Sequence, residues 1–96
     1  MASVELTQLA ADELATLIHT HTLPSDTRRR VKASLRPLER FPRLGPELQG
    51  RYAGLRFLLG PRRWLVLVYS FDEEADRVTV ASIQDARATG APTGDR

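Results

Sequence analysis

The sequence predicts a single small α+β domain in which two N-terminal helices cover an antiparallel β-sheet. The chain has 96 residues, the size of one domain, and 42% of them are hydrophobic, as is ordinary for a globular protein. Apolar residues recur at helical spacing in the first half, and apolar extended runs with short links fill the second half. We expect residues 1–87 to form the domain and residues 88–96 to be a flexible C-terminal tail.

The first half of the chain predicts two helices. Over residues 7–20, leucines and alanines recur every three or four positions after a capping Thr7, as in an amphipathic helix. Ser25 and Asp26 offer a second N-terminus, followed by an apolar stripe and a strongly basic opposite face. Pro37 lies within this second helix and is expected to kink or divide it, because proline cannot donate the amide hydrogen bond.

The second half predicts three strands, at 55–59, 63–71 and 77–83, each rich in valine, leucine or aromatic residues. The links between them are short, so antiparallel hairpins are the natural pairing. Residues 4–6 offer a brief additional edge strand. The expected architecture is therefore a small antiparallel sheet with both helices on one face.

The middle strand is apolar on both faces, so each face needs a cover. Its alternating residues form two sets, Trp64, Val66 and Val68 on one face and Leu65, Leu67, Tyr69 and Phe71 on the other. Two short helices cover only one face of a small sheet. Either the loop of residues 42–54 or the C-terminal tail covers the second face, or that face is a docking surface for a partner segment, with Trp64 as its anchor.

The composition excludes or disfavours several classes of function. The chain has no cysteine, which rules out disulfides, thiol catalysis and thiolate zinc sites, and suits a reducing compartment such as the cytoplasm. It has no glycine-rich phosphate loop and no apolar run long enough to span a membrane, so we expect no cofactor and no membrane partner. His19 and His21 lie on different faces of a helix end, which argues against a shared metal. The acidic run at 72–74 is expected to be a solvated turn.

Arginine dominates the basic residues, since only Lys32 among the 14 lysines and arginines is a lysine. This bias reflects either codon usage in the host genome or selection for planar donors that bind phosphates and carboxylates. The arginines nearest to the predicted sheet are Arg51, Arg56, Arg62, Arg63 and Arg87. Antiparallel pairing would bring several of them to one concave side, where they would hold phosphate and stabilise a phosphoryl transition state. Alternatively, they are separate solvated side chains.

The order and spacing of several short motifs resemble the RelE/ParE superfamily of bacterial toxins over about residues 4–87. The matching segments are Glu5-Leu6-Thr7, 38–45, 48–50, 54–57, 66–69, 78–80 and 85–87. Members of this superfamily pack two N-terminal helices on a small twisted antiparallel sheet, in agreement with the fold predicted above. The resemblance implies that this chain is the toxin of a toxin–antitoxin pair, with a cognate antitoxin protein that wraps it and covers its site.

The resemblance implies two alternative targets. Members of the RelE branch are metal-independent ribonucleases that enter the ribosomal A site and cut mRNA, using basic residues to neutralise the scissile phosphate. Members of the ParE branch instead poison DNA gyrase. The RelE-like activity, with the ribosome and mRNA as partners, is the favoured implication. The alternatives are a gyrase inhibitor and a non-catalytic member that only binds an antitoxin or nucleic acid. An isolated toxin of this kind is expected to be a monomer.

Carried onto this sequence, the resemblance assigns the catalytic role to Arg56 and Arg87, which fall on basic positions within the first sheet strand and after the last one. The residues expected to contact RNA are Arg51, Arg62 and Arg63. Trp64 is expected to contact the antitoxin. All of these side chains lie in the sheet half of the chain, so the site is expected on the sheet and its turns.

Three positions of the family pattern differ in this chain. The arginine expected before Tyr69 is Val66, the second basic position of the first sheet strand is Leu58, and no tyrosine follows Tyr69. Arginine does not give up its proton near neutral pH, so it is a poor base. The general base of a nuclease would therefore be Asp85, Tyr52 or a water molecule.

Overall fold

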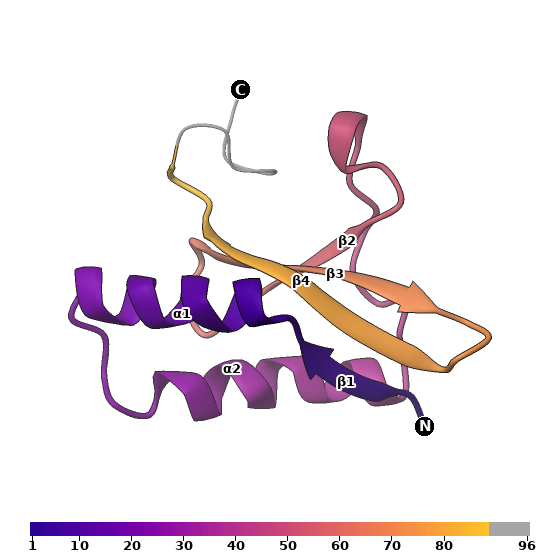
Figure 1. The fold of residues 1–96 in the computed structure, drawn as a ribbon, viewed down its shortest axis with the longest axis horizontal. Helices are drawn as coiled ribbons and strands as arrows, with labels where there is room; N and C mark the ends of the chain where they lie inside the picture. The colour runs from indigo at the N-terminus through magenta and orange to yellow at the C-terminus, as the bar shows by residue number, and fades with distance from the viewer. Residues whose placement is uncertain (89–96) are drawn as a thin grey trace.

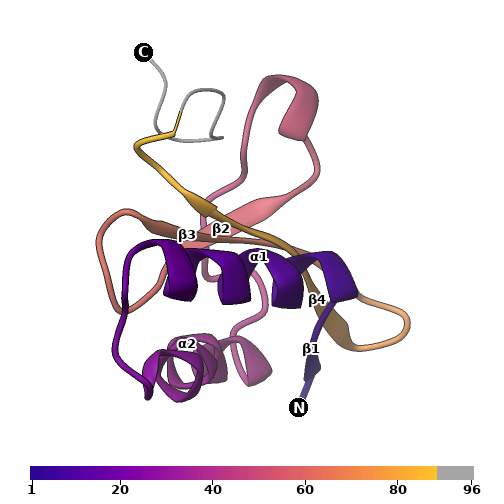
Figure 2. The same ribbon diagram turned by 60° about the vertical axis from the view of Figure 1, so that its left-hand side comes forward.

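The computed structural model of the chain describes residues 1–88 and confirms the predicted α+β class. Most of the expected tail, residues 88–96, lies outside the described residues, so its flexibility stays a prediction. The elements in chain order are β1 (Ser3–Leu6), α1 (Gln8–Thr20), α2 (Thr27–Leu35), the 3₁₀ turns η1 (Arg36–Glu39) and η2 (Gly50–Tyr52), β2 (Arg56–Leu59), β3 (Leu65–Asp72) and β4 (Arg77–Asp85). Both helices lie on one face of the sheet, whereas the segment with η2 rises from the other face (Figure 1, Figure 2).

Helix α1 begins where the sequence predicts, and its cap also fixes the helix to the sheet. The Thr7 hydroxyl accepts a hydrogen bond from the Ala10 amide at 3.1 Å. The same hydroxyl lies 3.2 Å from the carbonyl oxygens of Val80 and Ala81, and the Thr7 amide donates to Val80 at 3.1 Å. One side chain therefore satisfies the helix N-terminus and positions it against β4.

Helix α2 is divided from the following residues by Pro37, as predicted. The α-helix ends at Leu35 and continues as the 3₁₀ turn η1, with the proline in its first turn, where no amide hydrogen is needed. The cap predicted at Ser25 and Asp26 is only partly correct. Asp26 occupies the N-cap position, but its side chain makes no cap hydrogen bond, because its backbone is not extended there. The Thr27 hydroxyl instead donates to the carbonyl of Pro24 at 2.7 Å.

The sheet has the strand order β1-β4-β3-β2, and the prediction of a purely antiparallel sheet is wrong at one edge. Strands β2, β3 and β4 pair antiparallel, whereas β1 pairs parallel with β4, with Val4 opposite Val78. The direction of β1 follows from the contact of Thr7 with Val80, halfway along β4. Strand β1 must run toward this contact, because α1 begins directly after Thr7. Beyond that point Ala81 forms a bulge, and within residues 1–88 no strand pairs with the outer side of the second half of β4.

The helix-facing core contains the side chains that the sequence assigns to one face of β3. Leu65, Leu67 and Tyr69 are buried against both helices, with Phe71 packed beside them. The other buried members of this core are Ala2, Ala10, Leu14, Val31, Leu35, Leu38, Val78, Val80 and Ile83. No helix within residues 1–88 is long and apolar enough to cross a membrane.

The second face of β3 is covered by the chain's own loop. Val66 and Val68 are 0% and 1% exposed, and they pack with Leu48 from the loop of residues 42–54. Tyr52, Leu55, Phe57 and Ala86 surround this second cluster. The alternative in which this loop covers the face is therefore correct, and the centre of the face is no open docking surface.

Trp64 is placed differently from the prediction. It lies in the turn before β3 and packs against the helix-facing core rather than on the face of Val66 and Val68. The strict alternation of a strand does not extend to it, because Leu65 is the first residue that pairs with a neighbouring strand.

A glycine allows the chain to pass closely around the β2 edge. A Cβ atom added at Gly45 would collide with the backbone carbonyl oxygen of Phe57 and lie 3.0 Å from the Tyr69 hydroxyl. Backbone cannot move aside as a flexible side chain can. By contrast, the nearest atoms to a Cβ atom at Gly60 would all belong to the Leu65 side chain, with Cδ2 closest at 3.1 Å.

We therefore expect Gly45→Ala to lower the free energy of unfolding by about 2 kcal/mol or more, through overpacking against the backbone. Gly60→Ala is the matched control and should stay within about 1 kcal/mol of wild type. Urea denaturation followed by circular dichroism measures both values. Equal losses in the two variants would contradict the close approach at Gly45.

Candidate functional site

Arg56 lies on β2 beside the buried Tyr69, and its guanidinium holds a loop. Its Nη1 atom donates to the carbonyl oxygen of Gly45 at 2.7 Å and to that of Arg43 at 3.2 Å. Arg56 is paired with Tyr69 across the sheet, whereas its neighbour Phe57 packs into the second cluster. One edge of the guanidinium therefore has a structural role in the fold.

The Tyr69 hydroxyl completes this contact from inside the core. It accepts a hydrogen bond from the Gly45 amide at 2.9 Å. Burial raises the pKa of the Tyr69 phenol, and the Gly45 hydrogen bond and the Arg56 charge oppose this rise only in part. The phenol is thus neutral at physiological pH, so it acts in hydrogen bonding and not as a phenolate base.

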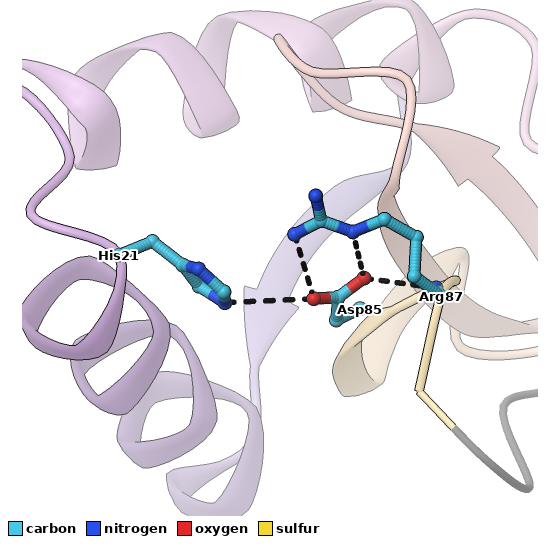
Figure 3. Close-up of polar contacts among 3 residues, drawn as sticks. All are labelled: His21, Asp85 and Arg87. Carbon is cyan, nitrogen blue, oxygen red and sulfur yellow. Dashed lines mark hydrogen bonds and ion pairs between the residues drawn. The ribbon is translucent and has the colours of Figure 1, made fainter.

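Arg87 belongs to a cluster of four side chains, His21, Trp64, Asp85 and Arg87, which we call the Arg87 cluster. The guanidinium makes two parallel bonds to the Asp85 carboxylate, from Nε to Oδ1 and from Nη2 to Oδ2, each 2.9 Å long (Figure 3). Its Cζ atom stacks 4.3 Å from the centroid of the Trp64 ring. His21 reaches the same carboxylate, with Nε2 at 3.5 Å from Oδ2, and its ring lies 5.0 Å from that of Trp64.

Three different elements bring the Arg87 cluster together. Asp85 ends β4, and its Oδ1 also accepts from the Arg87 backbone amide at 2.8 Å, which forms a tight turn. The Ala86 amide donates to the Trp64 carbonyl and fixes the two turns side by side. His21 is the C-cap of α1.

Glu13 sets the position of α1 along the outer side of β4. Its Oε1 accepts from the Ile83 amide at 2.9 Å and from the Ser82 hydroxyl at 2.8 Å, so it pairs an edge that β1 does not reach. Because α1 is held at this height, its C-terminal His21 lies opposite Asp85, as Figure 3 shows.

The electrostatics of the Arg87 cluster are dominated by the ion pair. The hydrogen bonds from Arg87 hold the pKa of the Asp85 carboxyl below its ordinary value of 3.8, against an opposing effect of burial. Asp85 is therefore ionised near neutral pH and is a weak proton acceptor. Its negative charge cancels the positive charge of Arg87.

The structure places three of the five predicted arginines at one end of the sheet and the other two elsewhere. Arg62 and Arg63 are exposed in the turn before Trp64, at the same end of the sheet as Arg87. Arg56 lies opposite Tyr69, whereas Asp85 lies opposite Leu65, so four residues of β3, about 13 Å, separate the two levels.

Arg51 lies apart from both groups, because η2 rises from the second face and places its guanidinium over Tyr52, with Cζ at 5.3 Å from the ring centroid. Arg62, Arg63 and Arg87 thus share one end of the sheet, and their grouping around one phosphate-binding surface stays a prediction. Arg56 takes part in a separate contact with the loop.

His21 is the member of the Arg87 cluster that the sequence did not indicate. It lies 64 positions from Asp85 in the chain, and only the packing of α1 on β4 brings them together. The acidic run forms the turn between β3 and β4, where Glu73 pairs with Arg43 at 3.1 Å. Among residues 1–88, no group of three His, Cys, Asp or Glu side chains is arranged to hold a metal ion.

Comparison with known proteins relates this fold to solved toxin structures. The toxin–antitoxin complex RelBE2 from Mycobacterium tuberculosis matches at 25% sequence identity with a TM-score of 0.59, over 88% of this chain and 90% of that chain. The chromosomal ParDE system from P. aeruginosa matches at 18% identity and a TM-score of 0.66, over 88% and 96%. A metal-bound toxin from Helicobacter pylori matches at 16% identity and a TM-score of 0.60, over 88% and 94%.

No protein-family model matches the chain, and the search of curated proteins gave no match. The likeness thus rests on the fold. Among these three structures, RelBE2 has the highest sequence identity to this chain.

The lowered pKa of Asp85 predicts a pH dependence of stability. A carboxyl whose pKa is lower in the folded state stabilises the fold above its unfolded value of 3.8, and this contribution is lost as the pH falls through the folded value. Arg87→Gln should therefore be less stable than wild type near neutral pH, and the two should converge below pH 3.8. Thermal unfolding over an acid pH series measures this. A difference that persists unchanged in acid would contradict the ion pair as its cause.

Proposed function

We propose that this chain, which has the fold of the RelE/ParE superfamily of toxins, acts as the toxin of a bacterial toxin–antitoxin pair with a cognate antitoxin protein as its partner. The observation that carries this proposal is the match to toxin–antitoxin structures of both branches over 88% of the chain. The order of elements predicted from the sequence motifs supports the same assignment.

For the target, we propose ribosome-dependent cleavage of mRNA in the cytoplasm, without a metal ion. In this reaction a ribose 2′-oxygen attacks the adjacent phosphorus and gives a 2′,3′-cyclic phosphate. The bond from phosphorus to the 5′-oxygen breaks, a base accepts the 2′-hydroxyl proton, and the leaving 5′-oxygen takes a proton from water. Arg87 would stabilise the extra negative charge on the phosphoryl oxygens. Figure 3 supports this role, because its third nitrogen, Nη1, points away from Asp85. The exposed Arg62 and Arg63 at the same end would hold neighbouring phosphates.

The electrostatics of the Arg87 cluster reduce the number of candidates for the proton acceptor in this mechanism. Asp85 is a weak base, because Arg87 lowers its pKa. Tyr52 and water remain from the sequence, and the structure adds His21, whose imidazole can accept a proton and whose Nε2 lies 3.5 Å from Asp85 Oδ2.

Arg56 supports the proposal less directly than Arg87. Its Nη1 atom is engaged by two carbonyl oxygens of the loop. Substitution of Arg56 would therefore alter the loop and the fold together with any contact to phosphate. Arg87 is the sharper test of the nuclease.

A second candidate function is inhibition of DNA gyrase. The ParDE structure has a higher TM-score than the RelBE2 structure, 0.66 against 0.59, and is covered over 96% of its length. The chain also exposes Phe41 and Leu44, at 60% and 53%, in the loop beside Pro42 that the family motif singles out. Such exposed apolar side chains suit contact with a large protein target.

Induced expression separates these functions. Under the nuclease proposal, expression without the antitoxin should arrest growth, and primer extension should show codon-phased cuts in translated mRNA. Co-expression of a small neighbouring open reading frame should restore growth. DNA-damage signalling with intact mRNA would instead identify the gyrase inhibitor, and normal growth with tight binding of that partner would identify a non-catalytic member.

If Arg87 stabilises the scissile phosphate, Arg87→Ala should lower the rate of mRNA cleavage by about a hundredfold or more and abolish growth arrest. Arg77→Ala, an exposed arginine at the opposite end of β4, is the control and should remain toxic. Full toxicity of the folded Arg87→Ala protein would contradict the assigned site.

A further inference from the structure

The contact between Asp85 and Arg87 has the form that arginine uses to bind phosphate. Two parallel hydrogen bonds from Nε and Nη2 meet two oxygens of one anionic group, each at 2.9 Å. A phosphate group would use the same edge of the guanidinium in the same bidentate manner. The best phosphate-binding edge of Arg87 is therefore already occupied within the chain.

We propose that Asp85 is an internal competitor of the phosphate group of RNA, so that Arg87 binds a phosphate fully only after the Asp85 carboxylate is displaced from it. This inference deepens the proposed function and rests on it for its biological meaning. It differs from an orienting role for Asp85, in which the carboxylate would strengthen phosphate binding.

The charges of the Arg87 cluster favour competition. Asp85 and Arg87 carry opposite charges that cancel, and His21 adds no charge when neutral. An approaching phosphate thus meets little net attraction until the carboxylate moves away. The long-range field at this end of the sheet then comes from Arg62 and Arg63.

Exposure shows from which side the exchange would take place. The Arg87 side chain is 57% exposed, whereas that of Asp85 is only 15% exposed. An anion from solvent therefore reaches the arginine directly, while the carboxylate is held behind it by the Arg87 backbone amide and His21. Stacking on Trp64 would keep the guanidinium in place during the exchange.

A proton cannot easily open this contact near neutral pH. Because Arg87 lowers the pKa of Asp85 below its ordinary value of 3.8, the carboxylate is ionised near neutral pH. Release then depends on a competing anion of higher charge density. RNA fulfils this condition only where several phosphates engage neighbouring arginines at once. The arrangement would make Arg87 weak toward isolated phosphates and effective on a bound RNA strand.

The test compares two Asp-to-Asn variants of matched local structure. Asp85→Asn keeps an oxygen that can accept from the Arg87 amide, because asparagine forms the same turn, but it removes the charge. Asp72→Asn is the control, since the Asp72 carboxylate accepts from the Ala75 amide in the turn at the other end of β3 and β4.

Binding of inorganic phosphate and of a ribodinucleoside monophosphate is measured by NMR at low ionic strength, from the Trp64 indole and Arg87 amide signals. Asp85→Asn should bind both ligands about tenfold tighter than wild type, since one nearby negative charge is removed. Asp72→Asn should bind both ligands with the affinity of wild type. Arg87→Gln, made in wild type and in Asp85→Asn, should abolish the ligand-induced shift of the Trp64 signal.

Equal or weaker binding by Asp85→Asn would overturn the inference and assign Asp85 an orienting role. The same gain in Asp72→Asn would also overturn it, since net charge alone would explain the result. A gain for inorganic phosphate without one for the dinucleotide would overturn the assignment to RNA. If Asp85→Asn does not fold, Asp85→Ser, which supports a similar turn, gives the same comparison. Because these assays measure binding and not cleavage, they can succeed or fail independently of the nuclease proposal.

Discussion

The peptide of Gly45 is the point on which the rest of this structure depends. The Gly45 amide donates to the buried Tyr69 hydroxyl and the Gly45 carbonyl accepts from Arg56, so both backbone polar groups of this residue are fixed where the chain passes around the β2 edge. From there the loop carries Leu48 onto the second face of β3. Without this crossing, Val66 and Val68 would face water, and the sheet would lack the smaller of its two hydrophobic clusters. An arginine expected to act on substrate thus also stabilises the fold.

Much of the fold could be predicted because its determinants are local. Three signals lie within a few residues of the structure that they determine. These are the spacing of leucines in α1, the proline that ends α2 and the short links between β2, β3 and β4. The parallel pairing of β1 was not predictable in the same way. It depends on Thr7 meeting Val80, a contact between residues 73 positions apart.

In the candidate site, too, local sequence patterns predicted some features, whereas features that depend on long-range contacts were missed. Arg87 was indicated by its place after the last strand, and its neighbours Arg62 and Arg63 by the preceding turn. His21 was not indicated, because Glu13 must first fix α1 along β4 before His21 meets Asp85. Trp64 was assigned to the wrong face, because the alternation of a strand was extended one residue too far into a turn. Local patterns identify which side chains carry charge, whereas tertiary packing decides which of them share a partner.

The position of Trp64 has one further consequence. It is the only tryptophan of the chain, and its ring lies close to a guanidinium, with Cζ at 4.3 Å, and to an imidazole, with its centroid at 5.0 Å. Its intrinsic fluorescence should therefore change when either neighbour moves, since indole emission depends on the polarity around the ring. The chain thus contains its own optical reporter at the end of the sheet where its function is proposed, and no label needs to be attached there.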